Sequence, residues 1–188
     1  MKTLMTVMLI LIANGCSIFP HPRPSAVHDF GYSISNAPSE INTSTQQSPI
    51  TVEAPKWLSD NHIRYRLLYS TPTQVRFYSL DRWIAPPPEL FEQLLNASGK
   101  QWHNPVTIQL QVFEQQFDTL DKAKVVMHFT AIITAGDKAK VNKRDFHLQL
   151  PCPTPDAKGA VSGFTQLTKQ AVDKIQAWVA TQNLASPL

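Results

Sequence analysis

The sequence is poor in cysteine and in charge, and its apolar runs are short. It has two cysteines among 188 residues, 17 Lys and Arg against 14 Asp and Glu, and a net charge of +3. Two cysteines exclude a disulfide framework, and so weak a charge gives no indication of nucleic-acid binding. The apolar run from Leu4 to Ala13, broken by Thr6, covers about half of the roughly 20 residues that a membrane-spanning helix needs.

Motifs for catalysis or metal binding are also missing. The six histidines form no H-E-x-x-H pair, and no P-loop sequence is present. The stretch Gly159–Gly163 has the wrong spacing for a nucleophile elbow, and no histidine follows Ser162. Cys152 lies between two prolines and has no activating neighbour. We therefore expect no enzyme, no metal site and no cofactor.

The first recognisable motif lies at the N-terminus. A charged start, a short apolar run and small residues before a cysteine are typical of a secretory signal. Ala13-Asn14-Gly15-Cys16 resembles the lipobox of bacterial lipoproteins, although Leu is usual at the Ala13 position. The resemblance implies that residues 1–15 are cut off and that Cys16 carries a diacylglycerol and an amide-linked acyl chain such as palmitate. The alternative is an ordinary secretory signal with an unmodified Cys16.

The segment after Cys16 is rich in proline. Residues 17–27 alternate prolines with small and polar residues, which favours an extended chain. At about 3.1 Å per residue such a segment reaches on the order of 35 Å. We therefore expect residues 16–27 to be a lipidated tether, followed by a single domain over 28–184 and a short tail over 185–188.

Hydrophobic periodicity predicts an α/β domain. Alternation or β-branched and aromatic composition predicts strands, and two stretches have helical spacing, of which 86–99 also has good start and stop signals. The strands are expected at 28–34, 49–55, 62–70, 74–80, 105–117, 124–134 and 144–150, and the helices at 86–99 and 160–184. Short turns join the last three strands, so these strands form an antiparallel meander. The long amphipathic C-terminal helix is expected to cover the sheet, with membrane-surface binding as the alternative.

One local stretch has two interpretations. In Ser79–Phe91 an arginine and a tryptophan, Arg82 and Trp83, stand at a strand end before a helix that opens with proline. The structural interpretation packs Trp83 under the helix and lets Arg82 bond carbonyls or an acid. The functional interpretation is a binding surface, because Trp and Arg recur at interfaces.

Several stretches together resemble the PqiC-like family of ABC-type transport auxiliary lipoproteins. The resemblance covers roughly 28–184, and residues 35–48 look like an atypical insert. It lies in "HDFGYSI", "APKWLSDNHIRYRLLYS", "RFYSLDRWIAPPPELFEQLL", "IQLQVFEQQFD" and "VVMHFTAII". The resemblance implies a three-layer sandwich with a mixed sheet covered by helices. With it, Trp57, Arg82 and Trp83 become a candidate partner-binding surface.

The same resemblance implies a role and a place. Family members accompany an MCE-domain protein and an ABC-type membrane complex that moves lipids between the membranes of Gram-negative bacteria. Ser17 after Cys16 points by analogy to the periplasmic face of the outer membrane. A stand-alone lipid-binding carrier and an envelope assembly scaffold are the alternatives. The transported molecule, the contact surface and a homo-oligomeric state are left open.

Overall fold

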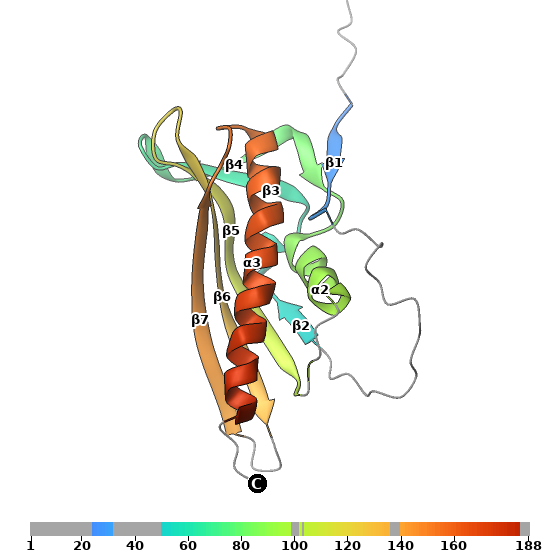
Figure 1. The fold of residues 1–188 in the computed structure, drawn as a ribbon. Coiled ribbons are helices and arrows are strands. Elements are labelled where there is room, and N and C mark those ends of the chain that lie inside the picture. Colours follow the sequence, from blue (N-terminus) through green and yellow to red (C-terminus); the bar gives the residue numbers. More distant parts are fainter. Residues whose placement is uncertain (1–23, 32–49, 99–101, 103, 136–139, 185–188) are drawn as a thin grey trace, which may run out of the picture.

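The structure is a computed structural model that describes residues 24–31, 50–98, 102, 104–135 and 140–184. It is a seven-stranded mixed sheet with two α-helices packed against it (Figure 1). The elements in chain order are β1 (Ala26–His28), β2 (Ile50–Glu53), the 3-10 helix η2 (Lys56–Leu58), β3 (His62–Leu67), β4 (Thr71–Trp83), α2 (Pro87–Ala97), β5 (Val106–Phe117), β6 (Ala123–Ala135), β7 (Lys140–Pro151) and α3 (Ala157–Leu184).

The strand β5 organises the sheet. It pairs along its length with β6, and β6 pairs with β7, which makes the antiparallel meander predicted from the short turns. The other edge of β5 takes two short strands, both parallel to it. β2 pairs with residues 106–109 and β3 with residues 115–117. β4 then pairs with β3, and β1 with β4, to complete the order β1-β4-β3-β5-β6-β7.

Both helices pack on the same face of the sheet. In α2, Phe91 lies 6.0 Å between ring centroids from Phe129 of β6, which in turn stacks on Phe146 of β7. Phe146 also meets Trp178 of α3. The fold class is therefore the predicted α/β arrangement with a helix-covered meander. The described part of the chain has two layers, one sheet and one layer of helices, where the family resemblance implied three.

Local signals account for the helix starts. α2 opens with Pro87 and Pro88, whose fixed φ suits a first turn, and Glu89 faces the positive end of the helix dipole. At the start of α3 the Asp156 Oδ1 atom accepts a hydrogen bond of 2.7 Å from the Gly159 N–H. This contact satisfies one of the free N–H groups of the first turn.

Each predicted helix and strand that lies in described residues is present, with shifted ends. β4 extends to 71–83 because its ends pair with β3 and β1, and β7 begins at 140 because it pairs with the long β6; the added residues lack a strand signature. β1 covers 26–28, so the tether prediction is wrong for Ala26 and Val27: these residues pair in parallel with Asp81 and Arg82 of β4. The predicted strand residues 32–34, the loop 35–48, the tail 185–188 and most of the tether lie outside the described residues.

The alternation predicted for β5 is correct in its first half and wrong in its second. Val106, Ile108 and Leu110 are buried under the helices as expected. A β-bulge between Leu110 and Val112 then shifts the register by one residue. Phe113 therefore enters the core in place of Val112, which turns to the other face.

Among the described residues, no helix combines the length and the apolar character that crossing a membrane requires.

Candidate functional site: a groove on the helix-free face of the sheet

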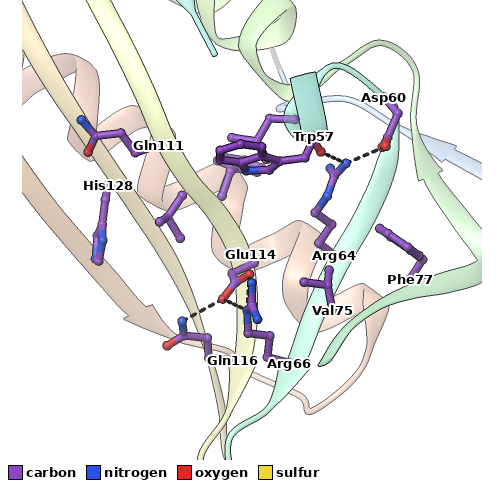
Figure 2. Close-up of a pocket in the computed structure, with 13 residues that line it drawn as sticks. Trp57, Asp60, Arg64, Arg66, Val75, Phe77, Gln111, Glu114, Gln116 and His128 are labelled. Carbon is purple, nitrogen blue, oxygen red and sulfur yellow. Dashed lines mark hydrogen bonds and ion pairs between the residues drawn. The ribbon is translucent and has the colours of Figure 1, made fainter. Parts of the chain in front are cut away.

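An open groove of about 450 Å³ lies on the sheet face opposite the helices (Figure 2). Its sides come from β3 and β4, its floor from β5, and one end from η2. Residues of alternating position on β3 and β4 point into it, since successive side chains of a strand face opposite ways. They are Arg64 and Arg66 on β3, and Val75 and Phe77 on β4.

The groove exists because the edge of β5 changes partners. β2 pairs with β5 as far as Gln109, and β3 takes over only at Gln115. Between these points β5 has its bulge, and η2 connects β2 to β3. Leu58 of η2 and Phe113 of β5, both buried, line the base of the groove. The groove therefore reaches the core beneath the sheet at this break in pairing.

The rim of the groove carries large apolar side chains that water reaches. Trp57 is 67% exposed, Phe77 is 46% exposed, and Val75 is also exposed. Val112 of β5 also lines the groove. Exposed apolar side chains grouped in this way, with polar residues around them, are typical of a binding surface.

Most polar groups of the groove bond to one another. The Arg66 Nε atom donates to both carboxylate oxygens of Glu114 at 2.8 Å, and Gln116 Nε2 donates to Glu114 Oε1 at 3.0 Å. Gln111 Nε2 donates to Thr130 Oγ1 at 2.9 Å. Glu114, 10% exposed at its side chain, is thus a buried carboxylate held by a paired cation.

Arg64 differs from these groups because one nitrogen of its guanidinium, Nη1, has no hydrogen-bond partner. The side chain is 6% exposed, and its Nη2 atom donates to the Trp57 carbonyl and to Asp60 Oδ2. Its Nη1 atom is buried and has no hydrogen-bond partner. Burial lowers the pKa of Arg64, and the Asp60 charge opposes that shift. The guanidinium still lies over the Phe77 ring at 5.5 Å, its cross-strand neighbour.

The structure separates the three predicted surface residues. Trp83 is 1% exposed, so its assignment to a partner-binding surface is wrong. Its ring meets Phe30, Phe113 and Phe164 of α3 at 5.2–6.1 Å, so Trp83 packs under α3 and not under α2 as the structural interpretation supposed. Adjacent strand residues face opposite ways, so Arg82 and Trp83 could not share a surface.

Arg82 and Trp57 are both exposed. Trp57 forms the end wall of the groove, whereas Arg82 borders a neighbouring hollow with His62 and Asp81. Phe77 lines both hollows, so they adjoin at that ring. Cys16 lies outside the described residues, and its lipidation stays a prediction.

The residues considered for chemistry at the sequence level have structural surroundings. Ser162 lies within α3, so no strand leads into it. Cys152 is half-buried, and burial raises the pKa of its thiol, which suppresses the reactive thiolate at neutral pH. The rings of His128 and His147 meet across β6 and β7 with centroids 4.4 Å apart. Among the described residues no three His, Cys, Asp or Glu side chains gather as metal ligands.

Sequence reasoning missed Arg64, Val75 and Phe77 as site residues. Arg64 and Arg66 stand at alternate positions of β3, on the face that lines the groove. The signal that could have found the site is the facing pair of patterns, Arg-x-Arg on β3 and Val-x-Phe on β4. Only the register, which sets Arg64 opposite Phe77, brings the two patterns together.

Comparison with solved structures shows the same fold in proteins of very different sequence. A Xanthomonas campestris protein assigned to the family DUF330 matches with a TM-score of 0.65 at 15% identity, over 89% of this chain and 94% of that one. A protein described as uncharacterized matches with a TM-score of 0.63 at 14% identity, over 83% and 99%. A proposed lipoprotein from Caulobacter crescentus CB15 reaches a TM-score of only 0.41 at 12% identity, over 53% and 84%.

Searches by sequence find neither a matching family model nor a matching curated protein. The two structural matches with TM-scores above 0.6 establish the fold, which this chain shares with the Xanthomonas campestris protein over nearly the full length of both.

Proposed function

We propose that the chain is a lipid-anchored protein of the outer membrane that acts as the auxiliary component of an inter-membrane lipid transport complex. Its partners in this role are an MCE-domain protein and an ABC-type membrane complex. The lipobox-like Ala13–Cys16 stretch supports the anchor, and the motif resemblance over 28–184 supports the complex.

The observation that carries a binding role is the helix-free sheet face. An α/β sheet that leaves one face open usually has polar side chains there. Here Trp57, Val75 and Phe77 are exposed on it around a groove. Aromatic and arginine side chains are enriched at the energetic centres of protein interfaces. We therefore assign partner contact to this face. Trp57 and Arg82 are the two residues at which we propose to test it.

The carrier alternative loses support from the core. A carrier was expected to enclose its ligand between the sheet and the C-terminal helix. That space holds Phe113 and Phe164, which stack at 3.9 Å, with Trp83 beside them. Tight aromatic packing leaves no room for an acyl chain at that place.

The test is site-specific photo-crosslinking in the native envelope. A photoreactive amino acid replaces Trp57 or Arg82, and the exposed Lys169 of α3, on the opposite side of the sheet, serves as the matched control position. We expect adducts with an MCE-domain protein at positions 57 and 82 but not at 169. Adducts with components of a different envelope machine would support the scaffold alternative and overturn the transport proposal.

A further inference from the structure

We propose that the open edge of β7 pairs with the β7 strand of a second copy of this chain, in an antiparallel register centred on Phe146. The two sheets then continue into one another across the shared edge. The inference goes beyond the proposed function, because it concerns contact between copies of the chain and does not require any partner of the transport complex.

β7 is the last strand of the sheet. Among the described residues no strand lies beyond it in the order β1-β4-β3-β5-β6-β7, and Figure 1 shows it at the outer margin of the sheet. Its 12 residues pair with β6 without a register shift. The backbone groups of β7 that point away from β6 therefore form a regular row, and such a row is a template for another strand.

The register shows which residues of β7 face the open edge. The Cys152 N–H donates to the Ala123 carbonyl at 2.8 Å, and the next pair along the ladder is Pro151 with Lys124. Backbone groups of an antiparallel strand alternate between facing the neighbour and facing away from it. Even-numbered residues of β7 therefore face β6, and odd-numbered residues from 141 to 151 face outward. Pro151 fits this assignment, because an edge strand tolerates proline where its nitrogen faces away from the neighbour.

The opposite margin of the sheet is protected against such pairing. β1 covers residues 81–83 of β4, and the register of β4 against β3 shifts twice along the remainder. Pro72, near the start of β4, has no N–H to offer. Bulges and prolines are among the devices by which proteins prevent association at sheet edges. β7 has no bulge, and its single proline is its last residue, so β7 is the edge that is left available.

A second copy of β7 matches this edge along nearly the whole strand. It offers the same regular row of outward groups over the same length. Two registers join outward residues with outward residues over this length, one centred on Asp145 and one on Phe146. The first sets the Asp145 carboxylate opposite its own copy, which is unfavourable because like charges directly opposite repel. The second avoids this clash, so we assign the register centred on Phe146.

The charges of β7 are compatible with this register. Charged side chains on an edge strand usually discourage pairing, and β7 carries several. Here each charged residue within the overlap faces a residue that is not of like charge. The facing pairs are Lys143 with Gln149, Asp145 with His147, and Arg144 with Leu148. The charges therefore do not oppose pairing with a second copy.

The geometry limits the association to a dimer. Two identical antiparallel strands are related by a twofold axis perpendicular to the sheet, so both copies use the same contact. Over residues 141–151 the ladder would contain about ten backbone hydrogen bonds, because each facing pair of outward residues exchanges two and Pro151 donates none. The axis keeps both helix-free faces on one side, so the two grooves open on a single surface. Each copy has then used its available edge.

Sedimentation equilibrium tests the association. Residues 16–188 carrying Cys16→Ser keep every described residue and lack both the apolar N-terminal run and an attached lipid. We expect a reversible equilibrium in which the dimer is the largest species. A monomer at every concentration up to about 1 mM overturns the proposal, and so does a series of larger species.

Amide hydrogen exchange followed by NMR tests which surface the dimer uses. The N–H groups of odd-numbered residues 143–149 gain acceptors in the dimer, so their exchange should slow at least about tenfold between dilute and concentrated protein. The N–H groups of even-numbered residues 144–148 face β6 in both states and serve as the internal control. A dimer in which the odd-numbered amides exchange as fast as in the monomer overturns the proposal.

A matched pair of substitutions tests the register. Gln149 is exposed, and in the proposed dimer it faces Lys143 of the second copy twice over. We expect Gln149→Glu to bind its copy more tightly than Gln149→Lys, with dissociation constants that differ at least about fivefold. Gln74→Glu and Gln74→Lys, at an exposed position of β4 on the opposite margin, should not differ. Equal dissociation constants of the two Gln149 variants overturn the proposed pairing.

Discussion

Trp57 and Trp83 show how little residue type says about surroundings. Both were candidates for a partner surface, because tryptophan is common at interfaces. Trp57 stands on a one-turn 3-10 helix at the end of the groove, whereas Trp83 ends a strand and lies among the rings of Phe30, Phe113 and Phe164. The same type of side chain is therefore exposed to solvent at position 57 and packed in the core at position 83.

This contrast predicts two very different costs of substitution. Trp83→Ala removes the centre of a buried aromatic cluster, and we expect the free energy of unfolding to fall by about 3–5 kcal/mol. Trp57→Ala removes a mostly exposed ring and should change it by no more than about 0.5 kcal/mol. Urea unfolding followed by circular dichroism measures both. A large loss in Trp57→Ala would show that η2 depends on that ring for its structure.

The paired rings of His128 and His147 predict a dependence on pH. Burial lowers the pKa of His128, the neighbouring His147 lowers it further, and Glu114 opposes the shift. The folded protein therefore binds fewer protons at His128 than the unfolded chain does. Its contribution to stability is full above the ordinary histidine pKa of about 6.5 and is lost as the pH falls through the lowered value.

We accordingly expect the free energy of unfolding to decrease between about pH 7.5 and about pH 5.5, where carboxylates stay ionised. His128→Asn should flatten this decrease relative to the parent protein. Denaturant titrations at a series of pH values give the slope. The same slope in His128→Asn as in the parent protein would contradict the assignment.

At the scale of elements, α3 approaches β6 closely at Gly163, which has no side chain to hold the two apart. A Cβ atom built on Gly163 would stand 2.8 Å from Cγ2 of Val125, which is fully buried in β6. Alanine normally favours a helix interior over glycine by about 1 kcal/mol. Here the added methyl meets a stiff, buried neighbour, so close packing outweighs helix propensity.

The expected result is that Gly163→Ala destabilises the protein by about 1–3 kcal/mol. Lys169→Ala, on the exposed side of the same helix, should stay within about 0.5 kcal/mol of the parent. Thermal unfolding compares the two variants directly. Stabilisation by Gly163→Ala would mean that α3 can move away from β6 at little cost.

The elements also differ in how well their sequence predicts them. Each of the two helices has an apolar stripe at helical spacing, and α2 also opens with prolines, so their type and approximate ends follow from local pattern. The bulge of β5 has no such signal. "QLQVFEQ" has no glycine or proline, and its adjacent apolar pair Val112-Phe113 does not say which of the two faces the core. Only the pairing with β6 shows that Phe113 takes the place expected for Val112.

For the whole molecule, the position of Cys16 predicts membrane attachment that is independent of the fold. Cys16→Ser should move the mature protein from the membrane fraction to the soluble fraction, because two or more acyl chains are needed for firm anchoring. Its thermal midpoint should not change, since the first strand of the domain begins at Ala26, ten residues after Cys16. Cys152→Ser is the matched control and should remain with the membrane. Membrane retention of a Cys16→Ser protein from which residues 1–15 have been removed would show that another part of the chain binds the lipid surface.

The sequence by itself determined the α/β class, the two helices and the antiparallel order of β5, β6 and β7. Each of these depends on contacts near in sequence: periodicity within one segment, or a turn too short for a crossover. The absence of a recognisable catalytic motif was likewise readable from residue types and spacing, and it directed attention to binding.

Only the tertiary structure decided which side chains share the groove. β2 and β3 are distant from β5 in sequence, yet both pair with it in parallel and leave a break between them. That break admits η2, exposes Trp57, buries Arg64 and sets it opposite Phe77. Register between distant strands is set by the burial of whole faces at once, so no single segment of the sequence contains it.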